Sequence, residues 1–208
     1  MILEAFESVV IPELTNDFKT NIENLFTSNH KQAIYRHVQR VATTNSEIAE
    51  KFHLNKEVCI QAAYCHDIAG IINENHMLQY ARDYNMPLDV AEEKYPFLLH
   101  QRFSALLAMD MFKINDERIL SAIAYHSTLK SNPSQYDMAL FVADKLSWDQ
   151  DGAPPYLQII QSEIDKSLYH ASLAYIEFVL NHNMILYPHH WLVEAYEWLK
   201  MYRCDGFN

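Results

Sequence analysis

Residues 59–70 read Cys-Ile-Gln-Ala-Ala-Tyr-Cys-His-Asp-Ile-Ala-Gly. Small and apolar residues recur here at helical spacing, which predicts a helix over 56–70, and Gly70 is the expected terminator. The face with Ala62 and Ala63 would let a second helix approach closely. Asp67 stands among Ala, Tyr, Cys and Ile, and a buried carboxylate without a partner is costly. The pair His66-Asp67 therefore requires partners from elsewhere in the chain.

Metal-capable side chains elsewhere in the chain fall in an order that suits this requirement. His37 precedes the pair, and His100, His126 and Asp144 follow it, at spacings of 18 to 33 residues. Each spacing is about one helix with its connection, so the six side chains would come from different helices and meet in one bundle interior. Imidazole and carboxylate bind divalent Zn, Mn, Fe and Ni, so the pattern predicts a metal site.

Composition predicts an all-α fold and a single domain over 1–208. Half of the 208 residues are hydrophobic, and only 3 Gly and 7 Pro occur, which argues against the many turns of a sandwich or barrel. The net charge of −11 disfavours nucleic-acid binding. No signal peptide or membrane span is evident, so we expect a cytoplasmic protein. Cys59, Cys65 and Cys204 make no CxxC pair and are expected to be buried free thiols.

Helical periodicity continues on both sides of the opening stretch. Asn115 or Asp116 is expected to cap the helix that ends at His126, and Ser134 with Asp137 resembles a capping box. Beyond 56–70, we expect helices over 30–52, 75–84, 97–112, a segment ending at His126, a segment after Ser134 that carries Asp144, 156–182 and 189–202. The core would span 30–150, with 151–208 as a helical extension packed on it.

A lone histidine on an apolar helix face is more often a hydrogen-bonded core residue than a ligand. His37, His100 and His126 are therefore informative only together with the two buried carboxylates. The pair His189-His190 is expected at a solvated helix start. Five other histidines stand in polar surroundings and are expected at the surface: His30, His53, His76, His170 and His182.

The order His, His-Asp, Asp resembles the HD superfamily of metal-dependent phosphohydrolases, and the two added histidines resemble its binuclear branch. Three segments are similar to the YqeK family: Leu98-Leu99-His100, Ala124-Tyr125-His126-Ser127-Thr128 and Phe141-Val142-Ala143-Asp144-Lys145. The resemblance covers about residues 30–150. It implies an HD-type helical bundle and hydrolysis of symmetrical diadenosine tetraphosphate, a small nucleotide, to two ADP.

The chain departs from this family at several positions. Gly70 replaces a Lys that is a phosphate contact in the family, and Arg40 and Leu129 replace two glycines. Leu146-Ser147-Trp148-Asp149 replaces a Glu-Pro-Gly-Arg segment. The metal site is thus retained while the nucleotide pocket is altered. Other candidate phosphate contacts, most of them expected to be ordinary surface charge, are Lys145, Arg36, Arg40, Lys130 and Arg102.

The resemblance implies two divalent ions, for which we expect iron or manganese before zinc. Asp67 would bridge them and, with His66, form the catalytic pair. One ion would be held by His37, His66, Asp67 and Asp144, and the other by His100, His126 and the second oxygen of Asp67. Such ions activate water, so no protein nucleophile such as Ser104 or Ser127 is required.

Two other classes of protein remain open from sequence. One is a regulatory or interaction module that keeps the fold without turnover, in which the aromatic carboxy-terminal helices form a homodimer seam or a partner surface. The other is a di-iron oxygenase, since His and carboxylate ligands within helices also support oxygen chemistry.

Overall fold

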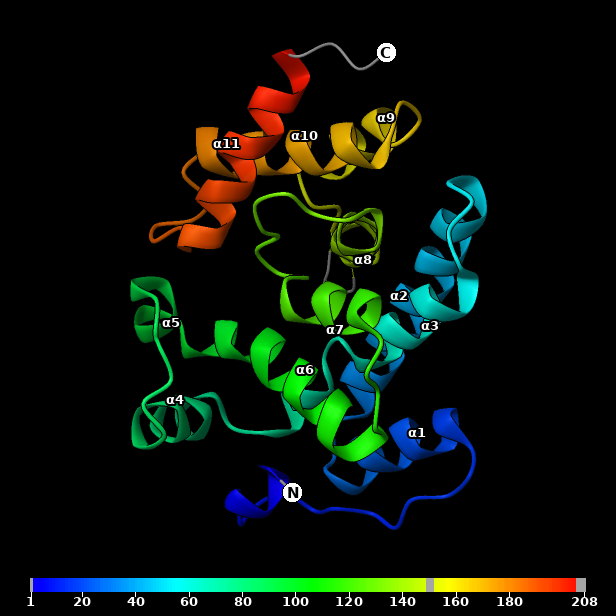
Figure 1. The fold of residues 1–208 in the computed structure, drawn as a ribbon, viewed down its shortest axis with the longest axis vertical. Coiled ribbons are helices and arrows are strands. Elements are labelled where there is room, and N and C mark those ends of the chain that lie inside the picture. Colours follow the sequence, from blue (N-terminus) through cyan, green and yellow to red (C-terminus); the bar gives the residue numbers. More distant parts are fainter. Residues whose placement is uncertain (1, 149–151, 205–208) are drawn as a thin grey trace.

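The computed structural model describes residues 2–148 and 152–204, and the side chains of 202–204, including that of Cys204, lie outside the described residues. This part of the chain is helical and contains no strand, which confirms the all-α prediction (Figure 1). Within the described ranges the α-helices are α1 (Phe18–Ser28), α2 (Gln32–Lys51), α3 (Lys56–Cys65), α4 (Glu74–Asp83), α5 (Val90–Lys94), α6 (Leu99–Phe112), α7 (Glu117–Ala124), α8 (Gln135–Leu146), α9 (Leu157–Glu163), α10 (Leu168–Asn181) and α11 (His190–Cys204).

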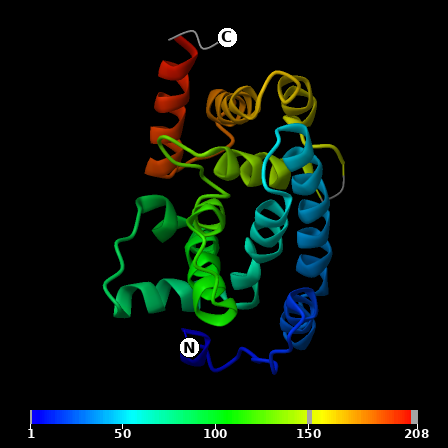
Figure 2. The same cartoon turned by 45° about the vertical axis from the view of Figure 1, so that its right-hand side comes forward.

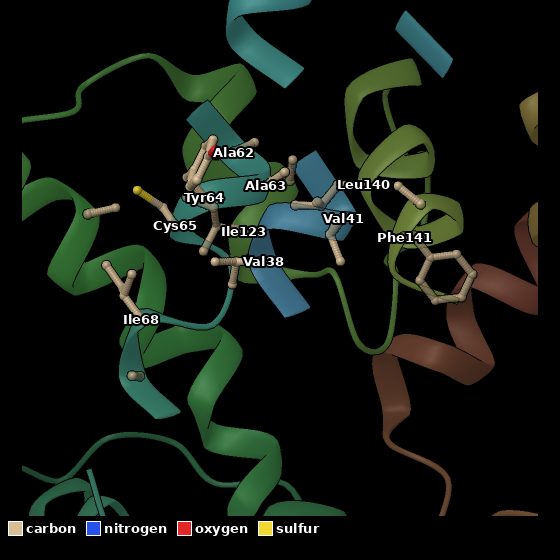
Figure 3. Close-up of a cluster of buried hydrophobic side chains, with 14 of the residues drawn as sticks. Val38, Val41, Ala62, Ala63, Tyr64, Cys65, Ile68, Ile123, Leu140 and Phe141 are labelled. Atoms are coloured by element: carbon tan, nitrogen blue, oxygen red, sulfur yellow. The ribbon is translucent and has the colours of Figure 1, made fainter. Parts of the chain in front are cut away.

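Helix α8 lies at the centre of the bundle. Its residues from Asp137 to Ala143 are all buried, and it packs against α2, α3, α7, α9 and α10. A helix that is apolar all round requires such surroundings. Figure 3 shows Leu140 and Phe141 of α8 beside Val41 of α2 and Ala63 of α3 in the hydrophobic core. The predicted capping box fixes the start of α8, because Ser134 accepts from the backbone N–H of Asp137 and the Asp137 carboxylate accepts from the N–H of Ser134.

Helix α3 is shorter than the sequence predicts. The expected helix 56–70 ends at Cys65, and a 3-10 helix, Ile68–Ile71, follows after the turn at His66-Asp67. Gly70 therefore does not terminate an α-helix, and that prediction was wrong. A Cβ atom at Gly70 would lie 2.7 Å from Cδ1 of Ile34, so glycine permits close approach to α2. The backbone break turns the His66-Asp67 pair towards the interior of the bundle.

The carboxy-terminal extension forms three helices instead of the two predicted. The segment expected as one helix over 156–182 divides after Glu163, because the backbone is extended at Ser167, whose hydroxyl caps α10 by accepting from the N–H of His170. The extension shares the buried core with α8, and the Phe141 and Tyr175 ring centroids lie 5.4 Å apart. Figures 1 and 2 both show α10 and α11 stacked on the end of the bundle nearest α8.

Two helices, α1 and α5, were not predicted. Helix α5 begins with a capping box in which the side chains of Asp89 and Glu92 each accept from a backbone N–H. Together with α4 it lies at one side of the bundle, in the segment of the chain that connects α3 to α6 (Figure 1). Among the described residues, no helix is both long and apolar enough to cross a membrane.

Candidate metal centre

The six residues predicted as ligands converge at one point in the bundle. His37 comes from the second turn of α2 and Asp144 from the last turn of α8, and their Nε2 and Oδ1 atoms lie 3.1 Å apart. His100 comes from the first turn of α6, while His126 lies two residues beyond α7. His66 and Asp67 lie together in the turn after α3, and all six side chains are buried or half-buried.

Three of the histidines are oriented by the same backbone contact. The Nδ1 atoms of His66, His100 and His126 lie 2.6, 2.5 and 2.8 Å from the carbonyl oxygens of the residues three positions earlier. A carbonyl can only accept, so each Nδ1 carries the proton and each neutral ring directs the lone pair of Nε2 into the centre. This second contact fixes the tautomer and the ring orientation that a metal ligand needs.

The two oxygens of Asp67 face different groups of imidazoles. Oδ2 lies 3.4 Å from Nε2 of His66 and 3.8 Å from Nε2 of His37. Oδ1 lies 3.2 Å from Nε2 of His100 and 3.5 Å from Nε2 of His126. Asp67 thus stands between two sets of donor atoms, each of which could hold one ion.

The first set is completed by Asp144. Its Oδ1 lies 3.8 Å from Nε2 of His66, and its Oδ2 accepts from Nζ of Lys145 at 2.8 Å. The same ammonium donates to the backbone carbonyl of His126 at 2.8 Å. Lys145 is buried. Its ammonium connects Asp144, in the first set, to the backbone of His126, which belongs to the second set.

The electrostatics of the centre favour charged carboxylates and, at His66 and His126, neutral imidazoles, whereas Asp67 outweighs burial and raises the pKa of His100. Burial opposes ionisation of Asp67, yet the imidazoles of His66, His100 and His126 hold the pKa of its carboxyl well below the ordinary value. The pKa of Asp144 is also lowered, because Lys145 and His37 outweigh its burial. Burial lowers the pKa of His66, and it lowers that of His126 to about 4. Deprotonated side chains of both kinds are the forms that bind metal ions.

The donor geometry fits metal ions. The Nε2 atoms of His100 and His126 lie 3.0 Å apart, a separation that a cation bound to both nitrogens would satisfy. Two ligand atoms ~2.1 Å from one ion at right angles would be ~3.0 Å apart. The buried Nε2 of His66 has no hydrogen-bond partner. With three or four protein donors in each set, an ion would keep open positions for water and substrate.

Gln101 is a supporting residue that sequence reasoning missed. Its buried side chain accepts from the backbone N–H of Ser127 at 3.1 Å, which fixes the turn after His126. The hydroxyl of Ser127 in turn lies 3.4 Å from Nε2 of His100. No sequence signal separates Gln101 from a surface glutamine, because its partners are 26 and 27 residues away.

The remaining histidines lie outside this centre. His30, His53, His76 and His182 are exposed as predicted, and His170 is half-buried beside Ser167. His190 is exposed at the start of α11, as predicted, but His189 is buried, which corrects the expectation of a solvated pair. Nε2 of His189 lies 3.7 Å from the buried Glu92, and His190 pairs with Asp89 at 2.7 Å. These contacts join α11 to α5.

An all-helical bundle that brings four imidazoles and two carboxylates together has the architecture of a metal-dependent hydrolase. The chain belongs to the HD domain family, whose model matches residues 34–149, more than half of its length. HD domains bind divalent metal ions, and the chain is an enzyme of the metal-dependent phosphohydrolase type.

Similar proteins agree with this assignment. The chain is 36% identical to a protein from the pepC 5′ region of Lactococcus lactis subsp. cremoris over 142 residues, which cover 68% of this chain and 72% of that protein. It is 25% identical to the symmetrical bis(5′-nucleosyl)-tetraphosphatase of Bacillus subtilis, covering 79% and 88% of the two chains. The corresponding Staphylococcus aureus protein is 26% identical, over 74% and 80%.

The fold also has a counterpart among solved structures. A crystal structure of a predicted HD superfamily hydrolase involved in NAD metabolism from Clostridium acetobutylicum matches with a TM-score of 0.76 and 22% identity. The match covers 91% of this chain and 99% of that one, so it includes most of the carboxy-terminal extension as well as the family core.

Proposed function

We propose that the enzyme hydrolyses diadenosine tetraphosphate symmetrically, with one water, to two ADP. The observation that carries this proposal is the Asp67 carboxylate, whose two oxygens face two separate donor sets. A pair of ions held in this way can bind both the attacking water and a phosphoryl oxygen of an anhydride. The names of the relatives from Bacillus subtilis and Staphylococcus aureus support a dinucleoside tetraphosphate as the substrate.

The proposed ligands are His37, His66, Asp67 and Asp144 for one ion, and Asp67, His100 and His126 for the other. Bound there, iron or manganese would lower the pKa of a water and neutralise charge that develops on the phosphate. The protein groups position these ligands: the three backbone carbonyls orient imidazoles, and Lys145 orients Asp144. Asp67 is the proposed bridge and, with His66, the proposed catalytic pair.

Several cationic side chains lie in the same part of the molecule and are candidates to neutralise the negative charge of the substrate phosphates. Arg102 is bound to Glu92 and to the carbonyl of Pro87, and Lys130 is bound to Ser121 and Asp137, so both have structural partners. Arg36 and Arg40 lie exposed on α2. Gly70 provides no cation and Lys145 is bound to Asp144 and to the backbone of His126, so the ions would carry most of the interaction with phosphate.

The test is turnover by the full-length protein reconstituted separately with Fe²⁺, Mn²⁺ or Zn²⁺. Diadenosine tetraphosphate should yield ADP as the single nucleotide product on anion-exchange chromatography, and a chelator should stop the reaction. ATP with AMP in equal amounts would contradict the symmetrical cleavage. No phosphate-bond cleavage in a broad nucleotide screen, with ions demonstrably bound, would favour the regulatory module instead.

A further inference from the structure

A cavity of about 510 Å³ lies between the family core and the α10–α11 connection. Its volume is within the range of roughly 300–1,000 Å³ that is typical of small-molecule sites. Much of its wall comes from residues 184–192, outside the matched range 34–149. In Figure 1, this connection lies on the same side of the molecule as α5 and the start of α6.

The cavity lies next to the metal centre, because residues of its wall contact two of the candidate ligands. Ser127 and Lys145 belong to its wall, and they contact His100 and Asp144, respectively. Phe97 also lines it, and the ring of Phe97 lies nearly parallel to that of His100, at 21°. The cavity is therefore close enough to the centre to receive the other end of a molecule whose anionic end reached the ions.

The lining near the opening is aromatic and exposed. Phe97 is 50% and Tyr187 is 45% exposed, so packing within the chain covers only part of each ring. Tyr95 lies between them, with ring centroids 6.2 Å from Phe97 and 6.1 Å from Tyr187 at oblique angles. Ring faces are thus available for a planar ligand, and base–aromatic stacking is a common way in which proteins bind nucleotides.

We propose that this cavity binds one nucleobase, with its ribose, of the nucleotide whose phosphates occupy the metal centre. Its occupant is inferred from the proximity of the cavity to the centre, its aromatic lining and its volume, and the inference rests on the proposed function. Phe97 and Tyr187 would supply the ring faces, one from the core and one from the extension. The extension would thereby determine which nucleotides bind, whereas the core would perform the hydrolysis.

Calorimetric binding of ADP and of pyrophosphate to the Mn²⁺-loaded full-length protein tests this subsite. Pyrophosphate has the phosphates but no base, so the ratio of the two affinities isolates the base. Tyr187→Ala should reduce that ratio by about 5- to 150-fold, the range of one lost base stack. Tyr187→Phe, which keeps the ring, should retain it. Tyr84→Ala, at an exposed tyrosine outside the cavity, is the matched control.

Two results would overturn the subsite: equal affinity of the wild type for ADP and pyrophosphate, or an equal loss of both affinities in Tyr187→Ala. Phe97→Leu provides a second, independent variant from the core side, with the same expected reduction in the ratio. Turnover of diadenosine tetraphosphate is measured separately. Its absence would contradict the proposed function, while the affinity ratio would still decide whether the cavity binds a base.

Discussion

At the scale of single residues, Asp67 is the side chain on which both donor sets depend. Asp67→Ala removes an oxygen from each set, so we expect hydrolysis to fall below detection and bound metal to fall from two equivalents towards zero. Metal analysis and turnover on the same preparation check this result. His53→Ala is the control, because His53 is exposed and lies outside the centre. Similar losses in both variants would mean that the ligands are assigned wrongly.

Lys145 is a positioning residue, because it holds Asp144 and the backbone at His126 without facing a donor set as a ligand. Lys145→Met keeps an unbranched apolar side chain and removes the ammonium, which lies 4.6 Å from the centroid of the Phe141 ring. We expect metal affinity to fall by about 10- to 100-fold, as for other residues that orient ligands. Competition with a chromogenic chelator measures it. Lys130→Met, at a lysine paired with Asp137, should leave metal affinity unchanged.

At the scale of elements, α8 couples stability to the site, because its capped start and its ligand Asp144 belong to the same helix. Ser134→Ala removes the hydroxyl of the capping box and should destabilise the protein by about 1 kcal/mol. For a chain of this size, the melting temperature should fall by about 2–4 °C. Calorimetry on metal-free protein measures the shift. Ser162→Ala, at an exposed serine that caps no helix, should shift it less.

The elements that were predicted correctly are those whose signals are local. The apolar stripe of α2, the Asp116 cap and the capping box at Ser134 each depend on residues within one or two turns. The order of the six candidate ligands likewise identified residues that the fold brings together. The division of 156–182 was missed because Ser167 is a weak signal inside an apolar period.

Long-range contacts account for the other errors. The burial of His189 depends on Glu92, which lies on a separate helix far away in sequence. Gly70 was interpreted as a terminator because its contact with Ile34 of α2 has no sequence signal. The cavity beside the metal centre was not predicted either, since its wall combines residues 95–98, which precede α6, with the α10–α11 connection.

At the scale of the whole molecule, we propose that residues 1–208 form a single domain, since the extension contributes to the same buried cluster as the core. Thermal unfolding should then be one cooperative transition. The three tryptophans, Trp148, Trp191 and Trp198, all lie near or within the extension, so their fluorescence follows that part. Its midpoint should coincide with that of the far-ultraviolet circular dichroism signal, to which all helices contribute. A fluorescence transition at lower temperature would indicate two domains.

In the proposed two-ion centre, the shared carboxylate of Asp67 would make the two binding events interdependent. An ion in either set withdraws negative charge from the oxygen that the other set uses, and it also fixes the rotamer that the other set needs. By thermodynamic linkage, each ion changes the affinity of the other by the same factor. Titration of metal-free protein with Mn²⁺ should therefore show two unequal steps. Asp144→Asn, which weakens only one set directly, should move both steps, whereas independent sites would move one.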